Sequence, residues 1–291
     1  MKKIIPKIMI IFLFLTLLFN RSAVSVAVIN GFNIWLNQLL PALFPFFIFS
    51  DMFVSSGIAS DLCKKIGPLF AKIFNTSKYS FFIFLISLAS GCPTNAKNIK
   101  NMLDNGYIFK DEAEKILCFT CFFNPFLIYS ITTLYLNHKD AIKIIVITYL
   151  SNIIIGLILR VKKIKINYLV KEKINKVTLV DSVRNTIMSL LSILGTIITM
   201  LVLVTLVKTN NVLIDNTLNG LLEITSGLIN LSSLSISYSL KKILTITYLS
   251  FGGISIHMQI KSILKDAISY KLFYQTRFLS ILISFLLSNI T

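Results

Sequence analysis

The sequence predicts an all-α membrane protein that crosses the bilayer several times. Of its 291 residues, 55% are hydrophobic and only 14% are charged, whereas soluble globular chains usually carry about 25% charged residues. Several apolar runs also have roughly the 17–25 residues that are needed to cross the hydrocarbon core of a bilayer. These observations exclude a disordered chain and an ordinary soluble enzyme, and we expect about six to eight transmembrane helices.

Six apolar runs are long enough to span the bilayer. They are 4–20, 37–57, 115–136, 141–159, 186–207 and 272–291. The first run could instead be a cleaved signal peptide. Further hydrophobic runs follow it at once, which favours an uncleaved span.

Two other apolar runs, 80–96 and 243–256, are too short or too polar to cross the bilayer cleanly. Each ends in a polar stretch that contains glycine, so we expect each to form a re-entrant hairpin that enters and leaves on one side. A weaker run, 217–236, contains Glu223 and many serines. This composition is typical of an amphipathic segment that lies at the membrane interface.

The net charge of +17 comes from 29 Lys and Arg residues against 12 Asp and Glu. Segment 160–184 alone holds eight basic and two acidic residues. Basic loops of membrane proteins favour the cytoplasmic side, so this segment is predicted to be cytoplasmic and to set the orientation of its neighbouring spans. A nucleic-acid interface is the alternative explanation, but a solvated loop near anionic lipid explains the charge better. We therefore expect the lipid bilayer, and no nucleic acid, as a partner.

The two predicted hairpins resemble each other. Residues 88–103 and 249–264 share five identities in sixteen positions, and each hairpin lies between two predicted spans. The charge pattern places the hairpins on opposite sides of the bilayer, which is the arrangement of secondary transporters built from inverted repeats.

This repeat divides the chain into four parts. They are an N-terminal membrane span at 1–30, a first repeat at 31–159 with its hairpin near 80–96, the basic loop at 160–184, and a second repeat at 185–291 with its hairpin near 243–256.

The candidate solute site lies in the polar, helix-breaking clusters of the two hairpins. In the first hairpin the candidates are Ser90, Gly91, Pro93, Thr94, Asn95 and Lys97. Glycine permits unusual backbone angles and proline cannot donate a backbone hydrogen bond, so the helix is expected to unwind here. The unwound backbone and the polar side chains could then bind a solute, with Lys97 attracting an anion. The alternative is a plain loop in which Lys97 only marks the membrane side.

In the second hairpin the candidates are Gly252, Gly253, Ser255, His257 and Gln259. A lone histidine is more often a structural residue than a ligand, and the hairpin position is what favours a binding role. Asn124 is a further candidate, because Pro125 would kink the span 115–136 and turn Asn124 toward a polar cavity. An ordinary packing kink explains Asn124 equally well.

The sequence holds no established catalytic motif. It has no P-loop, no dinucleotide fingerprint, no H-E-x-x-H and no G-x-S-x-G. Cys118 and Cys121 form a C-x-x-C, but no second Cys or His pair accompanies them as a zinc site requires. We therefore predict buried free thiols, no metal, no cofactor and no enzymatic activity.

Six stretches of the chain together resemble a known family. They are 31–35, 40–47, 89–97 (ASGCPTNAK), 112–115, 124–126 and 251–259 (FGGISIHMQ). In this order they resemble the YlbJ (SpoVV-like) family of sporulation integral membrane proteins, which belongs to the wider nucleoside-recognition or Gate-domain superfamily.

The resemblance implies a fold similar to that of concentrative nucleoside transporters, with the two hairpins in an inverted-repeat arrangement. It also implies a transporter in the mother-cell membrane around the forespore, which moves a small anionic solute such as dipicolinic acid toward the forespore. Lys97, His257, Gln259 and hairpin N–H groups would bind its carboxylates. Two alternatives stay open, namely a carrier of nucleosides or other metabolites and a non-transporting membrane protein needed for spore envelope assembly.

Overall fold

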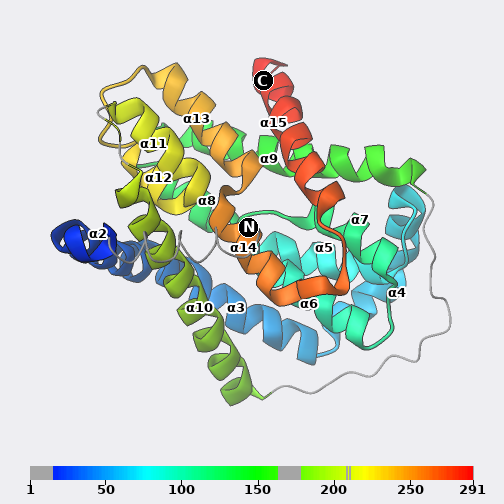
Figure 1. Cartoon of the computed structure of the whole chain (residues 1–291). Helices are drawn as coiled ribbons and strands as arrows, with labels where there is room; N and C mark the ends of the chain where they lie inside the picture. Colours follow the sequence, from blue (N-terminus) through cyan, green and yellow to red (C-terminus); the bar gives the residue numbers. More distant parts are fainter. Residues whose placement is uncertain (1–15, 163–177, 208, 210, 291) are drawn as a thin grey trace, which may run out of the picture.

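The computed structural model describes residues 16–162, 178–207, 209 and 211–290. These residues form a bundle of helices, with no strand among them, which confirms the predicted all-α class (Figure 1). The predicted span 4–20 and most of the basic loop 160–184 lie outside the described residues.

Within the described part, five helical segments are long and apolar enough to cross a membrane. They are Arg21–Phe53, Lys110–Thr132, His138–Val161, Leu179–Leu206 and Tyr238–Ala267. A sixth is possible if α4 (Ile58–Phe74) and α5 (Tyr79–Ser90), which meet at 98°, are counted as one bent span. The polytopic membrane class is therefore confirmed.

Two long helices form the outer support of the bundle. The first joins α2 (Arg21–Ile34), a π-helical turn η1 (Trp35–Leu39) and α3 (Leu40–Ser55). The second is α10 (Leu179–Leu206), which begins with a reciprocal capping box between Thr178 and Asp181. The helices pack along each other, and the indole N–H of Trp35 donates to the Leu190 carbonyl at 2.9 Å.

Two pairs of short helices turn back on themselves as hairpins. In hairpin 1, α5 packs against α6 (Thr94–Asp104) across the break 91–93. In hairpin 2, α11 (Val212–Leu222) packs against α12 (Ile224–Asn230) across the single residue Glu223 (Figure 1). The prediction of an interfacial segment at 217–236 is wrong, because the residues from Ile224 to Leu228 are buried inside the bundle.

Two other segments are broken spans, in which the helix is interrupted and then continues across the bundle. In broken span 1, α7 (Lys110–Thr120) and α8 (Pro125–Thr132) are separated by 121–124. In broken span 2, α13 (Tyr238–Phe251) and α14 (Gly253–Leu264) are separated by Gly252. The run 243–256 is thus part of a spanning helix and not the predicted re-entrant hairpin, because an apolar helix resumes directly after Gly252.

A single helix follows each broken span, namely α9 (His138–Ile158) and α15 (Lys271–Ile290). Short 3₁₀ turns, η2 (Leu159–Val161) and η3 (Lys265–Ala267), end α9 and precede α15. Each half of the chain therefore reads hairpin, broken span, helix.

The packing of these elements follows a two-fold pattern. Helix α6 of hairpin 1 packs on α14 of the second half, and α12 of hairpin 2 packs on α8 of the first half. Likewise α7 packs on α15, α13 packs on α9, and α9 and α15 pack on each other. Exchanging the two halves leaves this set of contacts unchanged, which is the behaviour of a structural repeat.

Contacts at the helix ends show that the broken spans run in opposite directions. Asp140, at the start of α9, accepts hydrogen bonds from Tyr238 and Lys242 at the start of α13. Glu114, at the start of α7, accepts a hydrogen bond from the backbone N–H of Ser269 just before α15. Helix α9 starts close to the C-terminal end of α8, so its contact with α13 places the start of α13 beside the end of α8. Broken span 2 therefore starts at the end of the bundle where broken span 1 finishes. The repeats are therefore inverted, but hairpin 1 corresponds to α11–α12 and not to 249–264 as the sequence alignment suggested.

Hairpin 2 depends on a close approach of two glycines. A Cβ atom added to Gly227 would lie 2.1 Å from the Cα atom of Gly220. We expect Gly227→Ala to separate the two arms and to lower the free energy of unfolding by about 1–3 kcal/mol, as overpacking does in other cores. Thermal unfolding in detergent measures the change.

Gly195 in α10 is the matched control, because a Cβ atom there would meet nothing within 4 Å. Alanine favours a helix over glycine by about 0.5–1 kcal/mol, so Gly195→Ala should leave the unfolding temperature unchanged or raise it. Equal unfolding temperatures for both variants would contradict the close packing of hairpin 2.

Candidate functional site

The tip of each hairpin packs on the break of the broken span in its own half. At the tip of hairpin 1, Gly91 has φ +73°, and a Cβ atom on it would lie 2.6 Å from the backbone nitrogen of Asn124. The Cys92 N–H donates to the Phe122 carbonyl at 2.7 Å, and the Asn124 amide donates to the Ala89 carbonyl at 2.6 Å. These bonds satisfy backbone groups that unwinding leaves without helical partners.

The second half repeats this contact. Gly253, the first residue of α14 directly after the break of broken span 2, has φ +65°, and a Cβ atom on it would lie 3.2 Å from the backbone nitrogen of Ile224 at the tip of hairpin 2. Larger residues would hold the two breaks apart. Glycine is therefore needed at one member of each contact, both for its backbone angle and for its missing side chain.

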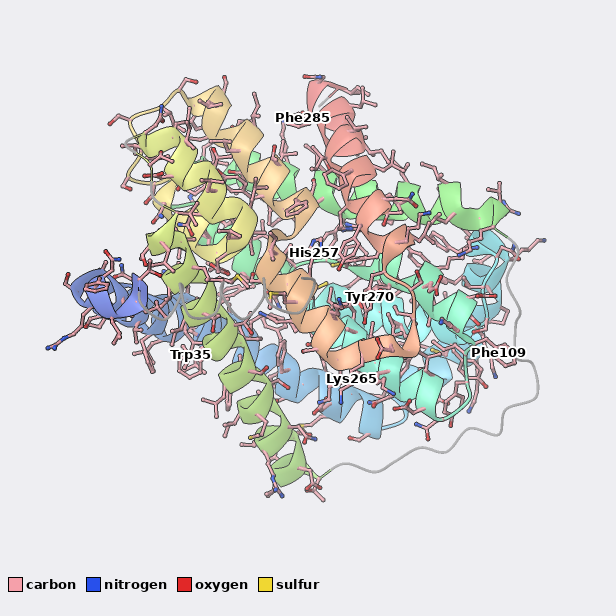
Figure 2. All side chains as sticks on the ribbon, in the orientation of Figure 1. Trp35, Phe109, His257, Lys265, Tyr270 and Phe285 are labelled. Carbon is pink, nitrogen blue, oxygen red and sulfur yellow. The ribbon has the colours of Figure 1, made fainter. Side chains whose placement is uncertain are left out.

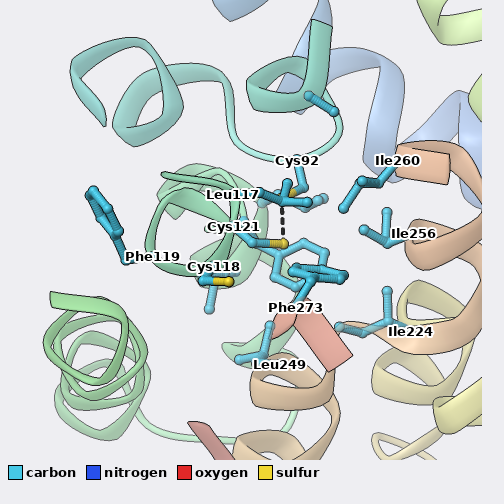
Figure 3. Close-up of a cluster of buried hydrophobic side chains, with 14 of the residues drawn as sticks. Cys92, Leu117, Cys118, Phe119, Cys121, Ile224, Leu249, Ile256, Ile260 and Phe273 are labelled. Carbon is cyan, nitrogen blue, oxygen red and sulfur yellow. Dashed lines mark hydrogen bonds between the residues drawn. The ribbon is translucent and has the colours of Figure 1, made fainter. Parts of the chain in front are cut away.

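A small cavity lies beside three of the four breaks, and we call it the junction cavity. Its volume is about 30 Å³, enough for about one water molecule. It is lined by Leu39, Leu43, Cys92, Pro93, Phe123, Leu127, Ile193, Ile197, Glu223, Ile224, Thr225, Ile256 and Gln259. Figure 3 shows Cys92 and Cys121 of the first repeat facing Ile224, Ile256 and Ile260 of the second.

A larger and more open cavity adjoins it, and we call it the solute cavity. Its volume is about 350 Å³. It is lined by Phe47, Asp51, Pro93, Thr94, Lys97, Asn185, Thr186, Met188, Ser189, Ser192, Ile193, Gln259, Ser262 and Ile263. The two cavities share Pro93, Ile193 and Gln259, so they adjoin each other, with Gln259 as the polar residue between them.

Four of the predicted site residues line the solute cavity. Pro93, Thr94 and Lys97 come from hairpin 1 and Gln259 comes from α14, so both repeats contribute as the sequence suggested. Gln259 is only 5% exposed, and its Oε1 has no hydrogen-bond partner. A buried acceptor of this kind favours a ligand that brings a donor.

The other polar candidates are absent from the lining of both cavities. The Ser90 hydroxyl donates to the Ile86 carbonyl in its own helix at 2.9 Å. The Asn95 amide donates to the Thr120 carbonyl at 3.2 Å, and Asn124 Oδ1 caps α8 by accepting from the Leu127 N–H at 3.1 Å. Ser255 is fully buried, and its hydroxyl has no partner. These residues, with Gly91, Gly252 and Gly253, shape the breaks and do not line either cavity.

The predicted ligand role of His257 is not supported by its position. Its Nε2–H donates to the Phe251 carbonyl at 2.8 Å, across the break at Gly252. Its ring stacks on Tyr274 with centroids 5.5 Å apart and packs on Phe273 at 5.2 Å. His257 thus lies where α13, α14 and the start of α15 meet (Figure 2) and supplies the hydrogen bond that the interrupted helix lacks.

Sequence reasoning missed one whole side of the solute cavity, which α10 supplies. The polar residues there are Asn185, Thr186, Ser189 and Ser192. Asn185 and Thr186 lie one turn before Ser189, and Ser192 lies one turn after it. The four residues therefore share one face of an apolar helix, and this was the signal available in the sequence. Asp51 of α3 and Glu223 of hairpin 2 were also missed as lining residues.

The four cysteines are buried free thiols, as predicted. The Cys92 thiol donates to the sulfur of Cys121 (Figure 3), which adds a contact between hairpin 1 and broken span 1. Among the described residues, no group of three or more His, Cys, Asp or Glu side chains could hold a metal ion.

Adjacent residues of α6 provide a test of the cavity. Thr94 lines it and is partly exposed, whereas Asn95 is fully buried against Thr120. We expect Thr94→Cys to react with a hydrophilic thiol reagent and Asn95→Cys to stay unlabelled, like the four native thiols. Mass spectrometry of the intact protein measures the labelling. Equal labelling of both variants would mean that hairpin 1 does not face an open cavity in this register.

Comparison with known proteins finds one informative relative. The chain is 26% identical to the sporulation integral membrane protein YlbJ of Bacillus subtilis (strain 168), over an alignment of 316 positions that covers 92% of this chain and 78% of the relative. No protein-family model matches the chain. No solved structure matches it.

Proposed function

We propose that this chain, a member of the YlbJ-like family of sporulation integral membrane proteins, is a transporter of a small polar solute. The observation that carries the proposal is the solute cavity, which adjoins the small cavity beside the breaks of both hairpins and of broken span 1. In an apolar bundle, unwound backbone is tolerated only inside protein or beside a watery cavity. Paired broken segments from inverted repeats are the usual solute site of secondary transporters.

The cavity suits a small molecule that makes many hydrogen bonds. Its volume of about 350 Å³ lies at the lower end of the range of about 300–1,000 Å³ that small-molecule sites occupy. Hydroxyl and amide groups from α6, α10 and α14 line it, and Lys97 adds a positive charge. A carrier must bind its solute weakly enough to release it. A lining of hydroxyl and amide groups with a single positive charge suits such weak binding.

The positive charge favours a small anion such as dipicolinic acid. Lys97 would form a charge-assisted hydrogen bond with one carboxylate, and the backbone and hydroxyl groups of the cavity would bind the rest. We place the carrier in the mother-cell membrane around the forespore, with transport toward the forespore. His257 has no part in this site, because it lies outside the cavity.

A nucleoside or another neutral metabolite is the second candidate. It is favoured by Asp51, which lines the same cavity and offsets the charge of Lys97. A purely structural role in spore envelope assembly fits less well, because such a role gives no reason for an open cavity lined by polar groups. The proposal includes no catalytic step.

Uptake into proteoliposomes tests the proposal with dipicolinate and uridine as the two probes. We expect wild-type protein to take up dipicolinate and Lys97→Gln to lose about ten-fold or more of its affinity, since a hydrogen bond to a charged group contributes about 1.5–3 kcal/mol. Lys100→Gln is the matched control, because Lys100 lies one turn further along α6 and pairs with Asp104. Unchanged dipicolinate uptake by Lys97→Gln would remove Lys97 from the site, and uptake of uridine alone would establish the second candidate.

A further inference from the structure

Glu223 is a buried acidic residue close to the solute cavity. It forms the tip of hairpin 2, is 2% exposed, and lines the junction cavity together with Pro93 of hairpin 1 and Gln259 of α14. One oxygen of its side chain accepts a hydrogen bond from the Ser226 N–H at 2.6 Å, which caps α12. The carboxyl group is therefore held in place beside the region where the two repeats meet.

No cation balances a charge on this carboxyl group. In the described part of the chain, no Lys, Arg or His nitrogen lies within 4 Å of Glu223. An ionised carboxylate that is buried without a cation is strongly unfavourable, and such a group takes up a proton instead.

The elements packed around Glu223 present few titratable groups. The residues of α3, α8, α10 and α14 that line the junction cavity are uncharged, and hairpin 1 contributes the thiol of Cys92. Helix α13 presents Tyr248 to α11, where its ring abuts Gly220. Lys97 and Asp51 line the adjoining solute cavity, and His257 of α14 faces the aromatic side chains of α15. The carboxyl group of Glu223 is thus the one acidic side chain that lines the junction cavity within the described residues.

Gln259 connects Glu223 to the solute cavity. Its side chain lines both cavities, and its Oε1 is buried without a partner. A solute that occupies the larger cavity beside Gln259 therefore lies next to the cavity that contains Glu223. The residues that line the junction cavity are largely apolar. A charge on the solute and a charge on Glu223 therefore interact more strongly than they would in water.

From this geometry we infer that Glu223 is a proton-binding site whose proton is carried together with the solute. An anion beside Gln259 is repelled by an ionised Glu223 and is not repelled by the protonated form. Proton binding and anion binding therefore strengthen each other by the same factor. The proton reaches a carboxyl oxygen of Glu223 from the same side of the membrane as the solute. The proton and the solute are then released together on the opposite side of the membrane. The coupling rests on the proposed transport function, whereas proton binding by Glu223 does not.

Infrared difference spectroscopy of the full-length protein tests proton binding without any solute. We expect a protonated carboxyl C=O band that disappears as the pH is raised through the neutral range. The band should be absent in Glu223→Gln and retained in Asp215→Asn, which removes a less buried acid from the same hairpin. Glutamine keeps the acceptor for the Ser226 N–H, so the variant should stay folded, and thermal unfolding checks this. A titrating band that is unchanged in folded Glu223→Gln would overturn the inference.

Proteoliposomes then test the coupling. With the outside acidic, wild-type protein should accumulate dipicolinate inside, whereas Glu223→Gln should exchange dipicolinate across the membrane at equal pH and lose the accumulation. Accumulation by Glu223→Gln at the wild-type level would overturn the coupling. So would loss of exchange in the folded variant, because Glu223 would then belong to the solute site itself. If wild-type protein transports neither dipicolinate nor uridine, the proposed function fails, and the infrared result still decides whether Glu223 binds a proton.

Discussion

The structure depends on one constraint, which is that backbone groups freed by a helix break inside an apolar bundle must find new partners. In water a broken helix is hydrated, but in hydrocarbon each unsatisfied N–H or C=O group is costly. This chain solves the problem by placing its breaks against each other. The Cys92 N–H and the Asn124 side chain join hairpin 1 to broken span 1, and His257 supplies the missing bond at Phe251.

The same constraint explains why the cavities are where they are. Breaks whose backbone groups hydrogen-bond to each other must lie close together, and only small side chains fit between them. Gly91 and Gly253 allow the close approach, and the imperfect fit of the helix ends leaves a space that is mostly apolar but is also lined by Glu223, Thr225 and Gln259. A cavity that holds a few polar side chains inside an apolar bundle is thus a consequence of how the backbone groups are satisfied, and function can use it.

The two repeats are also tied together by contacts between residues that do not line the cavities. The buried guanidinium of Arg277 in α15 donates to the Cys118 carbonyl in α7 and to Asn152 Oδ1 in α9 at 3.0 Å. At one end of the bundle Lys242 pairs with Asp140 at 3.0 Å, and at the other end Glu114 bonds the Ser269 N–H at 2.8 Å. Both end contacts join the start of a broken span in one repeat to the start of the last helix of the other repeat. These two end contacts would have to break or change geometry if one repeat moved relative to the other.

The sequence by itself determined the membrane class, most span positions and the places where helices break, because these depend on local properties. Apolar length sets what can cross a bilayer, and Gly91, Pro93, Pro125 and Gly252 mark breaks through their own backbone preferences. Hairpin 1, three of its cavity residues and Gln259 of α14 could be inferred in this way. Only the tertiary structure decided which break meets which. The second hairpin is short and carries Glu223, so its composition resembled a surface segment, and the similarity of 88–103 to 249–264 paired a hairpin with a broken span. Whether Glu223 faces a cavity depends on residues such as Leu39 and Pro93, which lie more than a hundred residues away along the chain, and no local pattern encodes that packing.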